Sequence, residues 1–201
     1  MRIMYSLAFA IWLTVSLCAM TVLWTYESTP GPNAHAPDQW PSTSKLASSD
    51  SSKQLLVWLH PRCPCSRATV AQLDRLLVHL PQDVHCQVII TQPPDVASSF
   101  VETDLTRSVR SMPVAVVMDD RQREARRFGV ATSGQVLLYG TGGRLEFAGG
   151  ITAGRGHHGD SAGSLTLRRL LSIADPPPSS DSSSVYGCCL FASDANAGSN
   201  Q

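Results

Sequence analysis

Two cysteines one residue apart stand in a short basic segment of this 201-residue chain. Cys63 and Cys65 flank Pro64, with Arg62 and Arg67 on either side. An apolar run precedes the segment and a helical pattern follows it, which places the cysteines at a helix amino terminus, where proline is well tolerated. The free N–H groups of such a terminus and nearby guanidinium groups favour thiolate, the nucleophile of disulfide exchange. The segment therefore predicts a reactive dithiol, with a purely structural cysteine pair as the alternative.

Hydrophobic periodicity predicts the elements that would position this dithiol. Three short apolar runs typical of buried strands cover residues 54–59, 84–90 and 114–118. Between the first two runs, apolar residues recur at helical spacing, at Val70, Leu73, Leu77 and Leu80. The pattern predicts a strand–helix–strand unit, with further helices over 95–110 and 121–128, the second ended by Gly129.

The second half of the predicted domain is a hairpin followed by a helix. Gln135–Tyr139 and residues 144–148 are predicted strands around a glycine-rich turn at 140–143. The last helix is expected to start near residues 161–164 and to bury Leu167, Leu170, Leu171 and Ala174. The resulting order, βαβαβαββα, indicates an α/β fold with a mixed central sheet flanked by helices.

The two ends of the chain differ from this unit in composition. Residues 3–26 carry no charge, and as a helix they would span about 36 Å, enough for a hydrocarbon core of roughly 30 Å. We therefore expect a transmembrane anchor over 1–26, a Ser/Pro-rich linker over 27–52, a domain over 53–174 and a flexible tail over 175–201. An atypical cleaved signal sequence is the alternative to the anchor.

The cysteine segment and its surroundings resemble the thioredoxin fold. The shared features are an apolar strand containing Trp58, a short loop, a cysteine motif with proline on the opening turn of a helix, and a later hairpin followed by a helix. More narrowly, HPRCPCSRAT, with FGVATSGQVLLYGTGGRLEFAGGITAGRGHHGD downstream, resembles the RedB-type thioredoxin-like proteins of bacteria over roughly residues 53–173. The resemblance implies a thioredoxin-like fold with an inserted strand–helix unit after an N-terminal transmembrane helix, and a thiol–disulfide oxidoreductase of the cell envelope.

The motif departs from the family pattern, which has C-x-x-C. Aligning Cys63 with the family's nucleophile puts Ser66 at the resolving position, whereas aligning Cys65 with the second cysteine puts Arg62 in the nucleophile's place. We prefer Cys63 as the attacking thiol. The place of the family's cis-proline is taken by Thr132, Ser133 and Gly134. That replacement argues against the family's usual mode of substrate docking.

Two further cysteines, Cys188 and Cys189, lie in an apolar island of the tail, VYGCCLF. A Cys63–Cys65 disulfide would close a small strained ring, and strained disulfides are labile. Cys188 or Cys189 is the other candidate for the resolving cysteine if the island docks over the dithiol, and a tail that only packs on the domain is the alternative. Cys86 is expected to be a buried strand residue.

Metal binding is the main rival function, because thiolates with nearby imidazole suit copper(I) or zinc. The alternative ligand set is Cys63, Cys65, His60 and His157. The same histidines can equally be loop residues that hydrogen-bond the backbone, with Asp160 capping the last helix or orienting an imidazole. A proton-transfer role of His157 would make the reduction rate depend on pH. A non-catalytic interaction domain is the third hypothesis.

The charge balance excludes a strongly basic nucleic-acid-binding chain, since 16 Lys and Arg meet 16 Asp and Glu. No glycine-rich phosphate-binding motif is present, and no cofactor is expected. The expected partners are protein or small-molecule thiols and disulfides, with the membrane as a further contact; the oligomeric state stays open. Arg2 and Glu27, on either side of the apolar segment, favour a single-pass helix with its amino end inside and the domain outside. Together with this orientation, the resemblance to bacterial thioredoxin-like proteins implies a location in the bacterial inner membrane with the domain in the periplasm.

Overall fold

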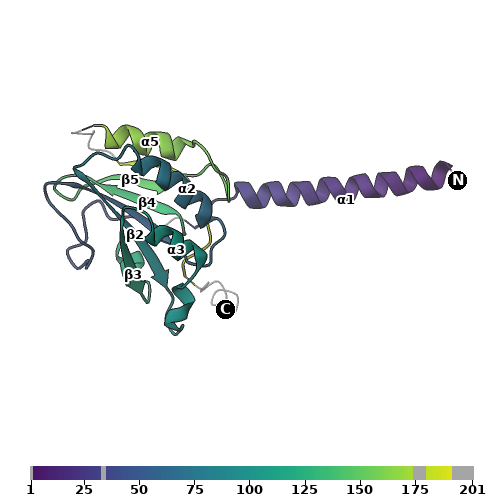
Figure 1. The fold of residues 1–201 in the computed structure, drawn as a ribbon. Helices are drawn as coiled ribbons and strands as arrows, with labels where there is room; N and C mark the ends of the chain where they lie inside the picture. Colours follow the sequence, from purple (N-terminus) through teal and green to yellow (C-terminus); the bar gives the residue numbers. More distant parts are fainter. Residues whose placement is uncertain (1, 33–34, 174–179, 192–201) are drawn as a thin grey trace, which may run out of the picture.

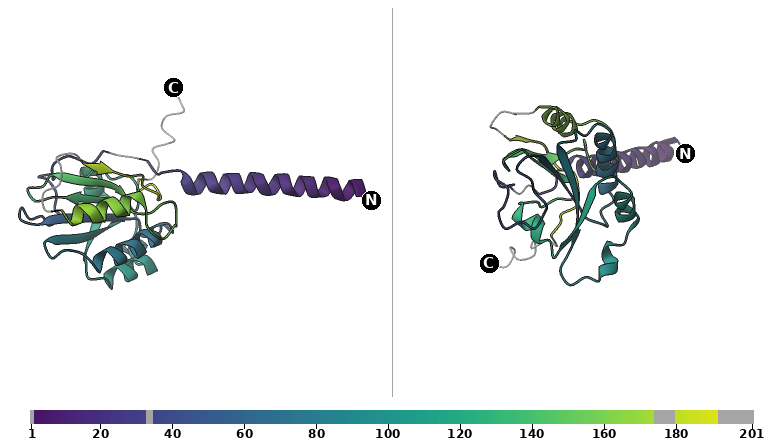
Figure 2. Two further views of the ribbon diagram at one scale, coloured as in Figure 1. Left: turned by 90° about the horizontal axis from the view of Figure 1, so that it is seen from above. Right: turned by 60° about the vertical axis from the view of Figure 1, so that its left-hand side comes forward.

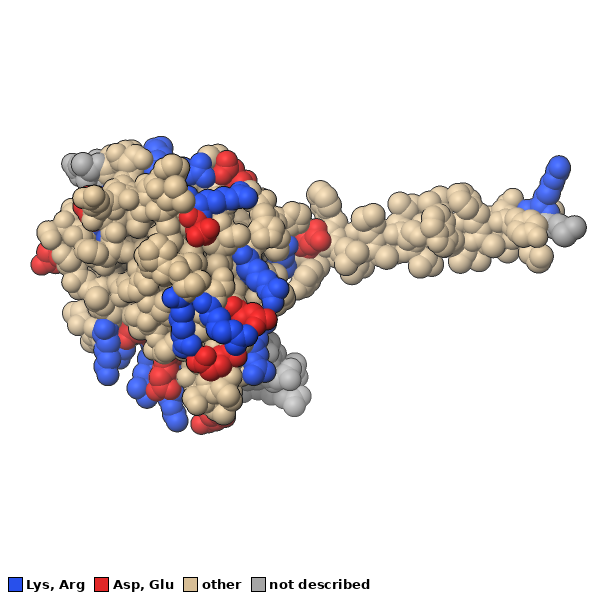
Figure 3. All heavy atoms as spheres, viewed as in Figure 1, with Lys and Arg blue, Asp and Glu red and all other residues tan. Residues whose placement is uncertain are grey.

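The computed structural model describes residues 2–32, 35–173 and 180–191. A long helix, α1 (Arg2–Ser28), projects from a domain built of strands and shorter helices (Figure 1). No α1 side chain is buried, and the helix is long and apolar enough to cross a membrane. Its length between the free end and the domain shows no charged side chain, whereas the visible face of the domain carries both signs (Figure 3).

Several serine and threonine side chains of α1 bond within the helix itself. Thr14 donates to the carbonyl of Ala10 and Thr21 to the carbonyl of Leu17, each at 2.8 Å. Because a lipid interior offers no hydrogen-bond partner, these internal bonds make the polar side chains compatible with apolar surroundings.

Six strands form one mixed sheet in the order β3-β2-β1-β4-β5-β6. Their bounds are β1 Lys53–Leu59, β2 Val84–Gln92, β3 Ala115–Asp120, β4 Gln135–Tyr139, β5 Leu145–Gly150 and β6 Asp181–Ser182. Strands β1, β2 and β3 are parallel, β4 is antiparallel to both β1 and β5, and β5 is parallel to β6. Every residue of β1 is buried, so the strand that leads to the cysteine motif lies at the centre of the domain.

Helices cover both faces of this sheet. Their bounds are α2 Ser66–Leu77, α3 Asp104–Arg110, α4 Arg123–Arg127 and α5 Ala162–Leu171, with a 3-10 turn at Ser98–Val101. Helices α2, α3 and α5 lie on one face (Figures 1 and 2). Because strand side chains alternate, Leu59 of β1 joins Leu73 of α2 on that face, and Trp58 joins Phe128, at the end of α4, on the other.

The predicted strands and helices are confirmed, with three differences, at residues 95–110, at the start of α4 and at β6. The helix predicted over 95–110 is divided into the 3-10 turn and α3, because Thr103 caps α3 by accepting the N–H of Thr106. The short strand β6 has no counterpart in the prediction, since its two residues carry no apolar pattern.

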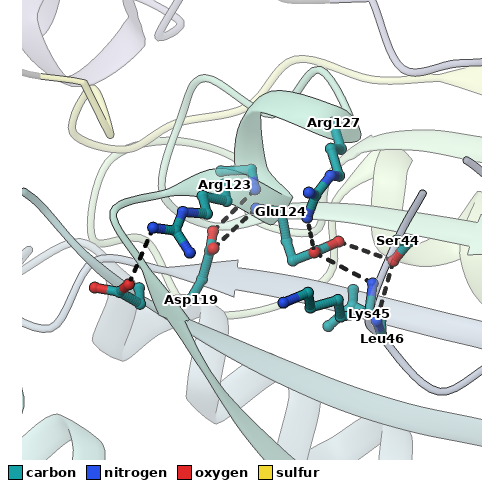
Figure 4. Close-up of polar contacts among 9 residues, drawn as sticks. Ser44, Lys45, Leu46, Asp119, Arg123, Glu124 and Arg127 are labelled. Atoms are coloured by element: carbon teal, nitrogen blue, oxygen red, sulfur yellow. Dashed lines mark hydrogen bonds and ion pairs between the residues drawn. The ribbon is translucent and has the colours of Figure 1, made fainter.

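Helix α4 begins later than the predicted 121–128 helix. Arg121 and Gln122 have positive φ angles of 56° and 57°, which interrupts the helical path. The carboxylate of Asp119 accepts the N–H groups of Glu124 and Ala125 at 2.8 and 2.9 Å (Figure 4). This carboxylate takes the role of an N-terminal cap, so α4 starts only after the left-handed pair.

The linker packs on the domain, although its composition predicts a tether without ordered packing. Trp40 meets Phe128 and Tyr139 edge to face, with ring centres 5.0 and 5.3 Å apart. Leu46 is also buried. Burying a large apolar side chain contributes about 1.5–3 kcal/mol, so a few such residues suffice to order a polar segment.

Polar contacts hold the same segment to α4 (Figure 4). The buried carboxylate of Glu124 accepts a hydrogen bond from the Ser44 hydroxyl at 2.8 Å and from the Lys45 N–H at 3.3 Å. Arg127 pairs with the same carboxylate. Glu124 thus joins residues 44–45 to the sheet face that carries Trp58.

Candidate active site

The cysteine motif lies in the turn between β1 and α2. Backbone hydrogen bonds from Ser66 N to Cys63 O (3.2 Å) and from Ala68 N to Cys65 O (3.1 Å) start the helical path. Cys65 is the residue immediately before the first turn of α2. Neither motif cysteine is in a disulfide, and Cys63 and Cys65 are only 3% and 7% exposed. The motif is therefore at the helix amino terminus, as the sequence predicts, but it is largely covered.

Hydrogen bonds hold Cys63 in its ionised form. Its sulfur accepts bonds from the thiol of Cys188 and the hydroxyl of Ser66, and also from the backbone N–H groups of these two residues. The Cys188 thiol contributes most, and together the donors lower the pKa of Cys63 from 9.0 to about 4, against the opposing effect of burial. Cys63 is therefore a thiolate at neutral pH.

A chain of hydroxyl groups extends this support to Ser133. The Ser133 Oγ accepts the N–H of His60 at 2.7 Å and lies 2.7 Å from the Ser66 Oγ. Because the Ser66 proton is directed to Cys63, Ser133 must donate its own proton to Ser66. Hydrogen bonds arranged head to tail polarise one another, so Ser133 strengthens the bond that Ser66 donates to the thiolate.

Cys65 has the opposite ionisation tendency. Burial raises the pKa of the Cys65 thiol, and the negative charge of Cys63 raises it further. Arg155 opposes both effects through its positive charge and a hydrogen bond to Cys65. The motif thus pairs a thiolate at Cys63 with a thiol at Cys65, which favours Cys63 as the attacking sulfur.

Sequence reasoning missed Arg155, which lies on the loop between β5 and α5. Its guanidinium contacts Cys65, the carbonyl of Tyr26 in α1 (3.2 Å) and the carbonyl of Gly187 in the tail. It also lies over the ring of Tyr26, 5.0 Å from the centroid. One signal for it was present in the sequence: Arg155 is the only charged residue over positions 147–159.

The tail crosses the site as an extended segment. Ser133 N–H donates to the carbonyl of Cys188 at 2.9 Å, and Leu190 N–H donates to the carbonyl of Ala131 at 2.8 Å. Cys188 is partly buried, whereas Cys189 is exposed, because successive side chains of an extended segment point in opposite directions. Of the two arrangements expected for the island, the structure has the one in which it docks over the dithiol.

The two arginines of the motif do not set the pKa of Cys63, contrary to the prediction. Neither Arg62 nor Arg67 is among the groups that most lower it. The guanidinium of Arg62 lies 4.3 Å from the ring centre of Phe100, which holds it by a cation–π contact. The ring of His60 packs edge-on against the same phenyl group, and burial lowers the pKa of His60, so the imidazole is neutral at neutral pH.

A surface depression of about 330 Å³ opens beside Cys63. It is lined by Pro61, Arg62, Pro64, Arg67, Thr103, Asp104 and Leu105. The motif arginines therefore line an approach to the nucleophile and are available to an anionic group of a small partner.

His157 and Asp160 have side-chain partners outside the cysteine motif. The Nε2 of His157 is 3.3 Å from a carboxylate oxygen of Glu27, at the end of α1. Asp160 forms an exposed ion pair with Arg168 at 2.8 Å. The cap of α5 is Ser161, whose side chain accepts a backbone N–H of the first turn, so the predicted capping role of Asp160 is wrong.

The remaining predicted residues are Trp58, which lies in the core, and Thr132 and Gly134, which hold the loop before β4 in place. Gly134 donates its N–H to the carbonyl of Trp58 at 2.7 Å and has a φ of +90°, a conformation that favours glycine. Trp58 itself is a core residue packed on Phe128, with ring centres 5.2 Å apart. The Thr132 hydroxyl donates to the carbonyl of Pro32 at 2.8 Å, which joins the segment to the linker.

The alternative metal site is not assembled. Within the described residues, no group of three or more His, Cys, Asp or Glu side chains could hold a metal ion. The proposed ligand set of Cys63, Cys65, His60 and His157 therefore does not gather in that part of the chain.

Comparisons with known proteins find similarity in fold. No family model matches the chain, and no curated protein matches it. A hypothetical protein from Sinorhizobium meliloti superposes with a TM-score of 0.57 at 20% identity, covering 81% of this chain and 93% of that one. An uncharacterized conserved protein from Geobacillus kaustophilus gives 0.59 at 14% identity, covering 83% and 94%. StoA from Bacillus subtilis gives 0.48 at 13% identity, covering 70% and 98%.

The chain has the thioredoxin-like fold. A parallel strand–helix–strand half and an antiparallel hairpin followed by a helix share one sheet, with β1 and β4 adjacent at its centre. The additional strand β3, with α3 before it, is the inserted unit that the sequence predicts. The cysteine motif lies at the junction of β1 and α2.

Proposed function

We propose that this chain is a thiol–disulfide oxidoreductase of the cell envelope that acts through the Cys63-Pro64-Cys65 motif. The observation that carries the proposal is the stabilised thiolate at Cys63, whose pKa is lowered to about 4 by hydrogen bonds. Thiolate is the attacking species in disulfide exchange, and a thiolate in a covered position with an open depression beside it suits a selective nucleophile.

The first step is attack of the Cys63 thiolate on one sulfur of a partner disulfide. A mixed disulfide forms, and the other partner sulfur leaves as a thiolate. A second cysteine of the chain then attacks the Cys63 sulfur, the bond to the partner breaks, and the partner leaves fully reduced. The chain is left with one disulfide, and the same steps in reverse oxidise a partner dithiol.

The charge of Cys63 controls the order of these steps. While Cys63 is a thiolate, its negative charge raises the pKa of Cys65. That charge disappears when Cys63 enters the mixed disulfide, whereas Arg155 stays in place and favours the ionised form of Cys65. A second cysteine therefore becomes easier to ionise only after the first attack.

We propose a location in the bacterial inner membrane with the domain in the periplasm. The support is the apolar helix α1, long enough to cross a membrane, with Arg2 before its apolar part and Glu27 after it. The proposed division is an anchor at 1–26, a linker at 27–52, the domain at 53–174 and a tail at 175–201, of which 1, 33–34, 174–179 and 192–201 lie outside the described residues. Membership of the RedB-type group stays a prediction.

A redox titration of the full chain in detergent micelles tests the proposed function. The chain is equilibrated in buffers of defined redox potential, and free thiols are counted by the mass added by maleimide. The wild type should show a reversible two-thiol transition that Cys63→Ser abolishes. Cys86→Ser is the matched control, because Cys86 is buried in β2 and should leave the transition unchanged. The absence of any reversible cysteine pair in the wild type would contradict the proposal.

A further inference from the structure

The tail segment of residues 185–190 is held between two other segments. On one side, Gly31 N–H donates to the carbonyl of Val185 at 2.8 Å. On the other side, the tail pairs with residues 131–133 through hydrogen bonds of 2.8 and 2.9 Å. Val185 and Leu190 are buried. Backbone bonds on both sides and two apolar anchors fix the direction in which each tail side chain points.

This placement presents one of the two tail cysteines to the motif. The thiol of Cys188 donates a hydrogen bond to the Cys63 sulfur, whereas Cys189 faces solvent. Glycine at position 187 permits the close approach of the tail to residues 131–133, because a Cβ there would clash with the carbonyl oxygen of Ser133. The guanidinium of Arg155 holds the Gly187 carbonyl from the other direction.

We propose that Cys188 is the resolving cysteine and forms a Cys63–Cys188 disulfide that fastens the tail over the site. The inference rests on the proposed function, since it names the second cysteine of the same reaction. The Cys188 sulfur, as thiolate, attacks the Cys63 sulfur of the mixed disulfide. The bond between Cys63 and the partner breaks, the partner leaves as a thiolate, and the proton of Cys188 passes to solvent. The partner disulfide has then gained two electrons, and Cys63 and Cys188 have lost them.

Geometry favours Cys188 over Cys65 in this step. Cys63 and Cys65 are separated only by Pro64, so a disulfide between them closes a small ring in a turn that already starts α2. Cys63 and Cys188 lie on separate segments, and the hydrogen bond between their side chains already brings the two sulfurs together. The hydrogen bond to the Cys63 thiolate is the main cause that raises the pKa of Cys188, and this cause ends when the mixed disulfide forms.

The test follows the fate of the mixed disulfide in the full chain in detergent micelles. The reduced protein is mixed with oxidised glutathione, quenched with acid and measured as intact protein and tryptic peptides without reduction. Cys188→Ser is compared with Cys189→Ser, a matched control one residue away, and with Cys65→Ser. Trypsin releases Cys63 and Cys65 on one peptide and Cys188 and Cys189 on another. The Cys65→Ser variant therefore assigns the motif cysteine of the link, and the Cys189→Ser variant assigns the tail cysteine.

We expect Cys188→Ser to accumulate the glutathione adduct on Cys63. Cys189→Ser and Cys65→Ser should resolve the adduct at the wild-type rate and yield a peptide pair joined through Cys63 and Cys188. Gly187→Val keeps every cysteine but disturbs the packing of the tail against Ser133. Resolution of the glutathione adduct in this variant should therefore slow by about tenfold or more. This second variant tests whether the position of Cys188 matters, and not only its presence.

The inference is overturned if Cys188→Ser resolves the adduct at the wild-type rate, or if Cys65→Ser accumulates it. In either case the glutathione adduct still forms, so the proposed function survives and Cys188 is not the resolving residue. If Cys63 forms no adduct in any variant, the proposed function and the inference fail together.

Discussion

Cys63 and Cys86 are buried to a similar degree, 3% and 8% exposed, but they ionise in opposite directions. In the middle of β2, burial alone raises the pKa of Cys86 to about 12. At the β1–α2 junction, burial acts in the same direction, but donors from Cys188 and Ser66 outweigh it and lower the pKa of Cys63 to about 4. The comparison shows that hydrogen-bond donors, above all the Cys188 thiol of the tail, can keep a buried cysteine ionised and therefore reactive.

The largest expected effect is on the pH dependence of stability. The folded pKa of Cys63 lies below its unfolded value of about 9, so ionisation stabilises the fold. This contribution is fully present above pH 9 and is lost as the pH falls toward 4. The difference in free energy of unfolding between the reduced wild type and Cys63→Ser should therefore grow between pH 4 and 9, as measured by urea unfolding in micelles.

Cys86→Ser provides the contrast in the same experiment. The pKa of Cys86 is raised, so its thiol is neutral in both folded and unfolded chains below pH 9, and the difference from wild type should stay level over this range. If the difference in free energy of unfolding between wild type and Cys63→Ser were also independent of pH, the distinction between the two sites would be contradicted.

Cys188→Ala should have the next largest effect, because the Cys188 thiol is the main group that lowers the pKa of Cys63. A hydrogen bond to a charged group is worth about 1.5–3 kcal/mol, so losing it should raise the pKa of Cys63 by about 2. The ultraviolet absorbance of the thiolate, followed against pH, measures the change. Cys189→Ala is the control, and an equal effect in both variants would mean that the tail acts without the specific donor.

Ser66→Ala should raise the pKa of Cys63 by about 1, because it removes a side-chain donor that contributes less than the Cys188 thiol. The same absorbance titration measures it. Ser164→Ala, which removes a buried serine of α5, would destabilise the domain without touching Cys63 and so separates a local effect from general loosening. A pKa unchanged by Ser66→Ala would contradict a contribution from the Ser66 hydroxyl.

Ser133→Ala should have the smallest effect, since Ser133 acts on Cys63 only through Ser66. We expect the pKa of Cys63 to rise by about 10–30% of the change in Ser66→Ala. The double variant Ser66→Ala/Ser133→Ala should match Ser66→Ala alone, because the chain of hydroxyl groups is already broken. Additive effects of the two substitutions would contradict a chain that runs through Ser66.

The local part of this arrangement could be predicted from the sequence. Apolar runs, helical spacing and the glycine-rich turn predict the strands, the helices and the position of the motif at the start of α2, because these features depend on neighbouring residues. The burial of Cys86 follows from its place inside an apolar run. The same reasoning placed a helix start near Ser161, where the cap lies.

The contacts between distant segments could not be predicted. Trp40 and Leu46 are isolated apolar residues in a polar segment, and no periodicity indicates which face of the sheet they cover. The stabilisation of Cys63 by Cys188 depends on how the tail aligns with residues 131–133, which local composition does not record. Charge near the motif in sequence pointed to Arg62, but its side chain is long enough to reach Phe100 instead.

The most direct test of the central claim is the pH dependence of alkylation at Cys63. The reduced Cys65→Ser chain is treated briefly with iodoacetamide from pH 3 to 10, and mass spectrometry quantifies the labelled peptides of Cys63 and Cys86. The account predicts an inflection near pH 4 for Cys63 and no ionisation of Cys86 below pH 10. An inflection of Cys63 near 9, the ordinary value of a thiol, would contradict it.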